Sequence, residues 1–326
     1  GTSFSYLDAD WKVLKSAGIL SRIKALAIPP AWENVWICPW ENGHLQATGR
    51  DARGRKQYRY HTGWRAQRDD TKFHHILSFA KVLPKIRRRV NRDLKRKEMS
   101  RDKILATVVR LLETTLIRIG NDEYARENGS YGLTTMHNRH VKVKGAGISF
   151  SFMGKSGKRH QINVQDKALA KTVRRCQDLP GQELFAYEDE EGEVRDVTSQ
   201  DVNDYLRAIA GEEYTAKDFR TWAGTVLAAL ALREFEVFTS QAQAKKNILT
   251  AIESVASMLG NTPAVCRKCY VHPGILNSYL QGATIETVKQ RMSMKVRGSL
   301  RQLRPEEAAV FVLLQRELNV DVEKAA

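Results

Sequence analysis

The chain is poor in cysteine, with four in 326 residues and only one pair close in sequence. That pair, Cys266 and Cys269, has the spacing of half a zinc site, but no second Cys/His pair stands near enough to complete four ligands. No signal peptide precedes the cysteines, so we expect a reduced, cytoplasmic setting and no disulfide framework. The sequence therefore predicts no metal site.

Long apolar runs are missing as well, and acidic residues are fewer than basic ones. There are 37 Asp plus Glu against 53 Lys plus Arg, a net charge of +16, while hydrophobic residues make up 42%. Without a long apolar span or a basic amphipathic anchor, no membrane contact is expected, and the apolar share is enough for a buried core. The positive charge favours a polyanionic partner, with nucleic acid first.

The first 72 residues predict a small domain rich in strands. A short helix is expected near residues 7–17, followed by strands near residues 35–40, 44–48 and 57–61. A glycine-flanked loop between the last two strands carries basic side chains that suit a phosphate backbone: Arg50, Arg53, Arg55 and Lys56. We place the domain boundary near residue 72.

Residues 73–326 predict a larger, mostly helical domain. Helical spacing runs through about residue 82, and residues 85–97 then carry eight basic side chains around an apolar stripe that recurs every four positions. Arg87 and Arg88 belong to this basic face, which suits contact with a phosphate backbone.

One small antiparallel sheet is expected inside this domain. Period-two patterns predict strands at residues 133–136, 140–143, 148–153 and 160–164, and helices predominate after residue 166. Lys155 falls at the tip of the hairpin between the last two strands, with Lys158 just after it. The fold class is therefore α+β.

A single tyrosine is placed by strong local signals. Gly260 ends a long helical pattern, Asn261 and Thr262 can cap a new helix, and Tyr270 follows about two turns later. Arg267 lies within one turn of Tyr270 and can attract phosphate. An aryl oxygen beside cations is a plausible nucleophile toward a phosphodiester, although most tyrosines near a helix are packing residues.

Five motifs make the chain resemble the type IB DNA topoisomerases in their short, poxvirus-like and bacterial form. The resemblance covers nearly the whole chain, and successive steps of 37, 65, 41 and 9 residues separate Arg118, Lys155, Arg220, Asn261 and Tyr270. The motifs are Leu116-Ile117-Arg118-Ile119-Gly120 with Gly132-Leu133-Thr134-Thr135, Phe152-Met153-Gly154-Lys155-Ser156-Gly157-Lys158, Lys217-Asp218-Phe219-Arg220-Thr221-Trp222, Gly260-Asn261-Thr262-Pro263, and Arg267-Lys268-Cys269-Tyr270.

The resemblance implies that Tyr270 attacks a backbone phosphate and forms a 3′-phosphotyrosyl link, which a free 5′-hydroxyl later reverses. Arg118 and Arg220 offer planar, charged forks to the phosphate oxygens, and Lys155 is suited to protonate the leaving oxygen, with help from Lys217. Relatives in viruses and eukaryotes carry histidine where this chain has Asn261. Asparagine can donate a hydrogen bond but cannot exchange a proton, so an oxyanion contact is expected there.

The resemblance also implies a monomer that closes its two domains as a clamp around duplex DNA and relaxes supercoils of both signs. Such an enzyme needs no metal or nucleotide, and the lysine motif around Lys155 lacks the upstream glycine of a nucleotide-binding loop. Its location would be the cytoplasm, with the nucleoid if it is bacterial. The predicted DNA contacts are Arg50, Arg53, Arg55, Lys56, Arg87, Arg88, Lys158 and Arg267.

Two other functions stay open at this point. A tyrosine recombinase shares the chemistry, but it would carry His-x-x-Arg where this chain has Lys217 three residues before Arg220. A basic architectural protein would suit the charge but not the separated arginines, the lysine and the tyrosine. Tyr279 is the competing nucleophile, and because no basic residues flank it we interpret it as a packing residue.

Overall fold

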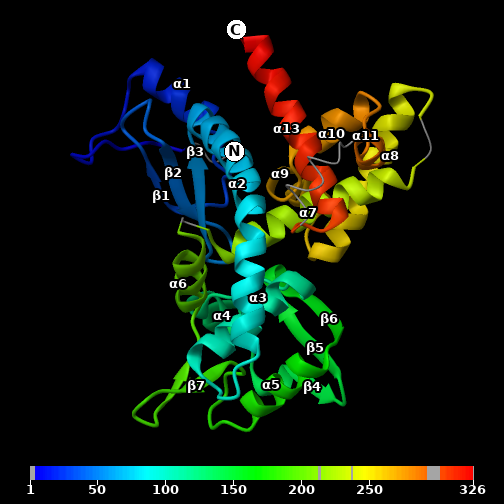
Figure 1. Ribbon diagram of the computed structural model, residues 1–326. Coiled ribbons are helices and arrows are strands. Elements are labelled where there is room, and N and C mark those ends of the chain that lie inside the picture. The colour runs from blue at the N-terminus through cyan, green and yellow to red at the C-terminus, as the bar shows by residue number, and fades with distance from the viewer. Residues whose placement is uncertain (1–3, 212–213, 236–237, 292–301, 326) are drawn as a thin grey trace. The chain divides into compact units, whose positions relative to one another are not determined.

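The computed structural model describes residues 4–211, 214–235, 238–291 and 302–325, and their side chains except at residues 65–74, 291 and 318–325. The protein is α+β, as the sequence predicts, and it divides into two compact units, Gly1–His74 and His75–Ala326. Figure 1 labels the helices and strands of both units.

The first unit contains helix α1 (Ala17–Ala25) and a three-stranded antiparallel sheet. Its strands are β1 (Glu33–Ile37), β2 (Leu45–Arg50) and β3 (Lys56–Tyr60), close to the predicted ones. The helix predicted at residues 7–17 is wrong. The Asp8 carboxylate accepts hydrogen bonds from the backbone N–H groups of Asp10 and Lys12, and this turn competes with helix formation.

A single long helix, α2 (Thr62–Leu94), crosses the division between the two units. The sequence predicts helical spacing to about residue 82 and a basic helix over residues 85–97, and the structure joins the two in one helix that continues through Pro84. A proline inside a helix removes one backbone hydrogen bond without necessarily ending the helix. The predicted apolar stripe is present, because Ile86 and Val90 are buried.

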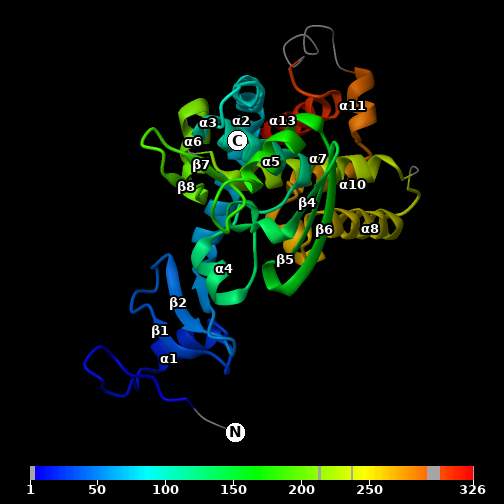
Figure 2. The same cartoon turned by 90° about the horizontal axis from the view of Figure 1, so that it is seen from below.

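The second unit holds an antiparallel sheet in the order β4-β5-β6. Helix α5 (Lys167–Gln177) packs against β4 and β5. Figure 2 shows this helix together with the sheet and its neighbouring elements. These elements are α3 (Arg101–Thr115), α4 (Asp122–Asn128), β4 (Val141–Lys144), β5 (Gly147–Gly154), β6 (Lys158–Gln165), β7 (Ala186–Glu188) and β8 (Val194–Asp196).

The strand predicted at residues 133–136 is wrong, because Leu133–Thr135 form a short 3-10 helix, η1. Two backbone N–H groups of this segment donate to carbonyls of the loop after α3, from Leu133 to Arg118 and from Thr134 to Ile119. These hydrogen bonds take the place of a strand ladder.

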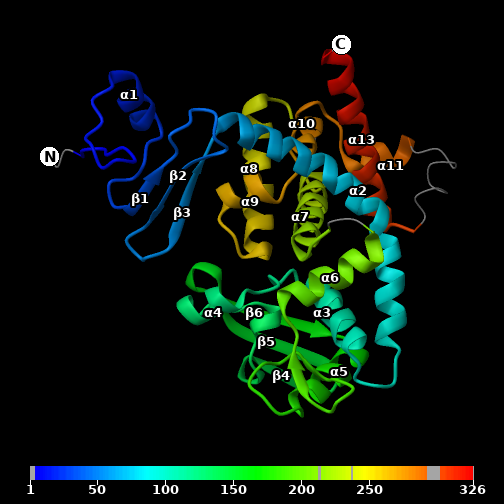
Figure 3. The same cartoon turned by 90° about the vertical axis from the view of Figure 1, so that its left-hand side faces the viewer.

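Helices make up the rest of the second unit. Figure 3 shows the helices α7 to α10 at one end of this unit and the β4-β5-β6 sheet at the other. The helices of this part of the unit are α6 (Ser199–Ala210), α7 (Ala216–Arg233), α8 (Gln241–Leu259), α9 (Pro263–Cys269), α10 (Pro273–Leu280), α11 (Ile285–Arg291) and α13 (Pro305–Ala325). Within the described ranges, no helix combines the length and the apolar character needed to cross a bilayer.

Candidate active site

Arg118 lies in a loop directly after helix α3 that backbone hydrogen bonds hold in place. The helix ends at Thr115, and the left-handed backbone of the next residue, Leu116 (φ 57°), turns the chain out of the helical path. The Arg118 carbonyl then accepts the Leu133 backbone N–H at 2.9 Å. A side chain at Gly132 would overlap the Gly120 backbone, so only glycine lets the two segments approach so closely. The fold thus fixes the base of the Arg118 side chain.

Asn261 follows the turn that ends helix α8. Gly260 adopts φ 61°, and the Asn261 N–H donates to the Ala256 carbonyl at 2.8 Å. The side chain is buried, and its Oδ1 accepts a hydrogen bond from Arg118 Nη2. Because a guanidinium only donates, this contact sets the orientation of the amide.

The other end of that amide is left as a free donor. Asn261 Nδ2 is buried and has no hydrogen-bond partner among the described residues. Leaving a buried donor unsatisfied costs about 1–3 kcal/mol, so such an atom is expected to meet an acceptor in the working complex. A phosphoryl oxygen is an acceptor of the right kind.

Arg220 lies on the first turns of α7 and is only 4% exposed. Its guanidinium donates to two backbone carbonyls, those of Leu116 and of Leu259, the latter at 2.7 Å. Burial lowers the pKa of Arg220, and the charge of Arg118 lowers it further, while the Tyr270 phenol acts in the opposite sense. The side chain therefore ties the end of α3 to the end of α8.

Tyr270 directly follows helix α9, which the sequence predicts correctly. Thr262 caps the helix by accepting the Val265 N–H at 3.3 Å, and Pro263 opens its first turn. The Tyr270 ring is half-buried, and Arg220 Cζ lies 5.1 Å from its centroid. The structure thus brings Arg118, Arg220, Asn261 and Tyr270 together from four separate segments.

Two other predicted catalytic residues lie apart from this group. Lys155 is exposed in the hairpin tip η3 (Lys155–Gly157), and its Nζ lies 5.7 Å from the ring centroid of Tyr124. Lys217 is exposed on the first turn of α7. In the described part of the chain, neither lysine donates a hydrogen bond to the four grouped residues.

Sequence reasoning missed one member of the site, His160 on β6. Its ring stacks on Phe152, the residue opposite it on β5, with centroids 5.1 Å apart. The same small pocket is lined by Arg118 and Arg220. Strand alternation could have placed His160 on the inner face of β6, but only the fold places it beside the arginines.

Lys158, predicted as a DNA contact, also reaches this site. Its Nζ donates to the Asn261 carbonyl at 2.9 Å. Arg267 is exposed on α9, one turn before Tyr270. Both cations therefore stand close to the segment that carries the tyrosine.

The predicted basic loop of the first unit has the expected turn. Arg53 and Lys56 are exposed there, and Arg50 donates to the Gly54 carbonyl at 2.7 Å. Arg55 forms an ion pair with Asp51 at 2.7 Å, and the Arg55 hydrogen bond holds the pKa of that carboxyl at about 2. Arg50, Arg53 and Lys56 are thus the residues of the loop that lack a carboxylate partner among the described residues.

Arg87 and Arg88 are neighbours with different surroundings. Arg87 is held in a buried ion pair by Glu307, with Nη1–Oε2 at 2.8 Å and Nη2–Oε1 at 2.7 Å, and also by Glu113. Two carboxylates thus balance the charge of Arg87 within the protein, while its DNA contact stays a prediction. Arg88 is exposed and bonds only to Gln302 among the described residues.

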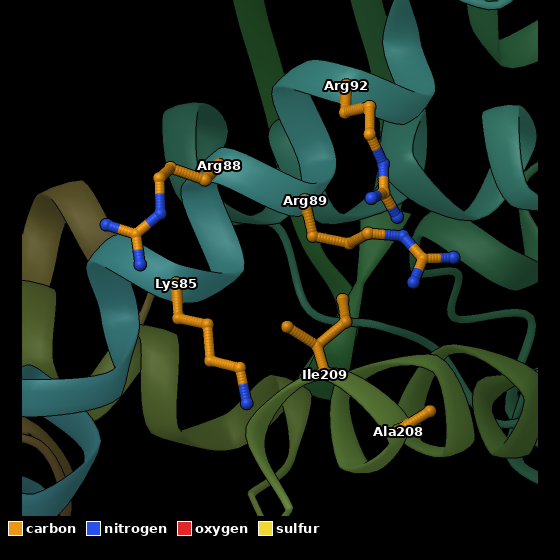
Figure 4. Close-up of a pocket in the computed structure, with 6 residues that line it drawn as sticks. All are labelled: Lys85, Arg88, Arg89, Arg92, Ala208 and Ile209. Carbon is orange, nitrogen blue, oxygen red and sulfur yellow. The ribbon is translucent and has the colours of Figure 1, made fainter.

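A basic groove of about 400 Å³ lies between α2 and α6. Figure 4 shows the Lys85 side chain reaching from α2 toward α6. Arg89 is neutralised by Asp93 and Asp102. The groove is lined by Lys85, Arg88, Arg89, Arg92, Ala208 and Ile209.

The competing nucleophile and the cysteine pair have ordinary structural roles. Tyr279 is buried, and its hydroxyl accepts a hydrogen bond from Asn247 Nδ2 at 2.8 Å, as expected for a packing residue. Cys266 is buried and makes no disulfide. Across the ranges with described side chains, no group of three His, Cys, Asp or Glu residues could hold a metal ion.

Comparison with known proteins gives a consistent result over nearly the whole chain. Residues 61–297 match the family described as eukaryotic DNA topoisomerase I, catalytic core, and residues 3–51 match the bacterial DNA topoisomerase IB N-terminal domain. DNA topoisomerase 1B of Acanthamoeba polyphaga mimivirus is 32% identical over 286 residues, which cover 86% of this chain and 85% of that protein. DNA topoisomerase 1B of vaccinia virus (strain Copenhagen) is 26% identical over 250 residues, covering 74% and 75%.

Proposed function

The chain belongs to the type IB DNA topoisomerase family and is an enzyme of that type, and we propose that it relaxes positive and negative supercoils by cutting and resealing one strand of duplex DNA. The reaction passes through a covalent tyrosyl intermediate. It uses neither ATP nor a metal ion. The protein acts as a monomer.

The observation that carries this proposal is the grouping of one phenol with two arginines and an amide. Arg220 lies against the ring of Tyr270, and Arg118 holds the amide of Asn261. No carboxylate is among the described residues that line the pocket beside them. A site with two cations, a free N–H donor and a phenol suits a phosphodiester, because each oxygen of the transition state finds a donor.

The reaction follows from these groups. The Tyr270 oxygen attacks phosphorus and loses its proton to water, the bond from phosphorus to the 5′-oxygen breaks, and that oxygen takes a proton. Arg118, Arg220 and the Asn261 amide stabilise the charge that grows on the non-bridging oxygens. The phosphotyrosyl bond keeps the energy of the broken linkage, so the 5′-hydroxyl can reverse the step after the strand has rotated.

Lys155 is the proton donor in this scheme, and it must leave its place over Tyr124 to act. Its exposed position in a hairpin tip allows that movement, since a lysine side chain is long and flexible. Lys217, on the first turn of the helix that carries Arg220, is proposed to assist. Lys155 therefore joins the site only when DNA is bound.

DNA is held mainly through its phosphates, by a clamp formed from the two units. The proposed contacts in the first unit are Arg50, Arg53, Arg55 and Lys56. Those in the second unit are Arg88, Lys158 and Arg267. Because each phosphate contact releases counterions, the affinity for DNA should fall steeply as the salt concentration rises. Arg88→Ala should make the negative slope of log K against log salt less steep by about 1. An unchanged slope would remove Arg88 from the interface.

The test compares the protein with Tyr270→Phe on plasmids of either supercoil sign, in EDTA and without ATP. The plasmid carries no recombination site, so a tyrosine recombinase would leave it unchanged. We expect the protein to relax both plasmids and to give a covalent adduct after denaturation, while the variant binds DNA but does neither. Adduct formation by Tyr270→Phe would show that another residue is the nucleophile. Failure of the unaltered protein to relax either plasmid would refute the proposal.

A further inference from the structure

His160 is wedged between two glycines that flank catalytic segments. A Cβ on Gly154 would lie 2.6 Å from His160 Nε2, and a Cβ on Gly260 would overlap the same ring. Gly154 directly precedes Lys155, and Gly260 directly precedes Asn261. One imidazole therefore touches both the hairpin that carries the proposed proton donor and the turn that carries the proposed oxyanion contact.

A second contact joins the same two segments. Lys158 stands two residues before His160 on β6, so both side chains leave the same face of the strand. Lys158 Nζ donates to the Asn261 carbonyl at 2.9 Å. On the other side, the His160 ring stacks on Phe152 of β5 at a tilt of only 14°. The imidazole is thus fixed by its strand partner and presses on the Gly260 turn from the sheet.

The charges around His160 keep it neutral. Burial lowers the pKa of this imidazole, and the cations Arg118, Arg220 and Lys158 lower it further. The phenol of Tyr131 also lines the pocket, and none of its described lining residues is a carboxylate that would favour protonation. A neutral ring in this place acts through its shape and packing.

We propose that His160 is a positioning residue of the cleavage site, which sets the Lys155 hairpin against the Asn261 turn so that proton donor and oxyanion contact meet the same phosphate. This inference rests on the proposed function. In the proposed reaction, His160 neither transfers a proton nor carries a charge. Without the imidazole ring, the hairpin moves away from the turn. The rate then falls in the step in which Lys155 donates its proton.

The first experiment separates positioning of the proton donor from a general loss of structure. Single-turnover cleavage is measured on a duplex with the normal 5′-oxygen leaving group and on one with sulfur at that position. Sulfur leaves without being protonated, so it bypasses Lys155. We expect His160→Ala to be about 10- to 100-fold slower on the oxygen substrate, as for a misplacement of about 1 Å, and within threefold of the unaltered protein on the sulfur substrate.

A double-mutant cycle tests the contact itself. Gly154 has φ −96° and ψ −173°, a backbone that alanine adopts without strain, so Gly154→Ala adds only the overlap with His160. That single variant should be slow on the oxygen substrate. In the His160→Ala background the same change should cost nothing further, because the ring it meets is gone. Additive losses would overturn the proposed contact.

Controls tie each outcome to one conclusion. Gln161→Ala changes the next residue of β6, whose side chain lies on the opposite face, and should cleave within twofold of the unaltered protein. His160→Gln keeps a flat, uncharged group of similar reach and should recover most of the rate. Equal slowing of His160→Ala on both substrates, or no slowing on either, overturns the inference. Failure of the unaltered protein to form any adduct would instead overturn the proposed function.

Discussion

Gly224 lies where helix α7 packs against Tyr270, and an alanine there should slow cleavage far more than it destabilises the protein. A Cβ at residue 224 would lie 2.8 Å from the Tyr270 carbonyl oxygen and 3.1 Å from its Cβ. Ordinary contact begins at 3.4 Å, so the carbonyl must move by about 0.6 Å. Because the atoms belong to or adjoin the backbone, the whole tyrosine moves with them.

Two effects on stability oppose each other in Gly224→Ala. Overpacking costs about 1–3 kcal/mol, while alanine gains about 1 kcal/mol over glycine inside a helix. The net loss in the free energy of unfolding should therefore stay at or below about 2 kcal/mol. Cleavage has no such compensation, and a nucleophile misplaced by a large part of 1 Å should react about 10- to 100-fold more slowly.

The assay pairs single-turnover cleavage with thermal unfolding of the same preparations. The matched control is Gly18→Ala in α1, where nothing lies within 4 Å of the added methyl group, so stability should rise slightly and cleavage should not change. A Gly224→Ala protein that cleaves within twofold of the unaltered enzyme would refute the reasoning. It would mean that α7 does not set the position of Tyr270.

Two further predictions concern a buried ion pair and the unusual asparagine. Glu307→Gln should lower the free energy of unfolding by about 3 kcal/mol at pH 7, because Arg87 loses its bidentate partner. Burial raises the pKa of Glu307, but the hydrogen bond and charge of Arg87 outweigh it and hold this pKa below its ordinary value of 4.5. The stability that the ion pair contributes is therefore present above pH 4.5 and is lost as the pH falls through the lower pKa of the folded protein. Urea unfolding at pH 7 and pH 4 should find a smaller gap at pH 4, and an equal gap would contradict the account. Asn261→His should keep substantial plasmid relaxation, because imidazole also donates a hydrogen bond, whereas the relaxation rate of Asn261→Ala should fall about 100-fold. Complete loss of relaxation in the histidine variant, with folding intact, would contradict the oxyanion contact proposed for Asn261.

Local signals account for the elements that the sequence predicts well. Helix α6 shows such signals, because Thr198 and Asp201 form a capping box at its start and Gly211 ends it. The helix before Tyr270 is likewise marked by Thr262 and Pro263. Each of these boundaries is decided by residues within four positions of one another.

Contacts between distant segments decide what the sequence leaves open. Arg87 and Arg88 look alike in a basic run, and their surroundings differ because Arg87 pairs with Glu113 and with Glu307, which is 220 residues further on. His160 gains its place from Gly154 and from Gly260, 100 residues away. No periodicity carries such information, because each partner belongs to a different helix, strand or turn.

The arginines of the second unit differ in whether a negative charge already occupies them. Arg87 is committed to two carboxylates, so its charge is cancelled within the protein. Among the described residues, Arg118 and Arg220 donate hydrogen bonds to uncharged oxygens, those of an amide and of two peptide groups, and Arg220 also lies against the phenol ring of Tyr270. Because neither side chain forms an ion pair with a described carboxylate, the phosphodiester of the proposed reaction can bind them without first breaking one. In the proposed function, the net charge of +16 favours binding of DNA in general, and these arginines, which have no carboxylate partner among the described residues, mark the place where the strand is cut.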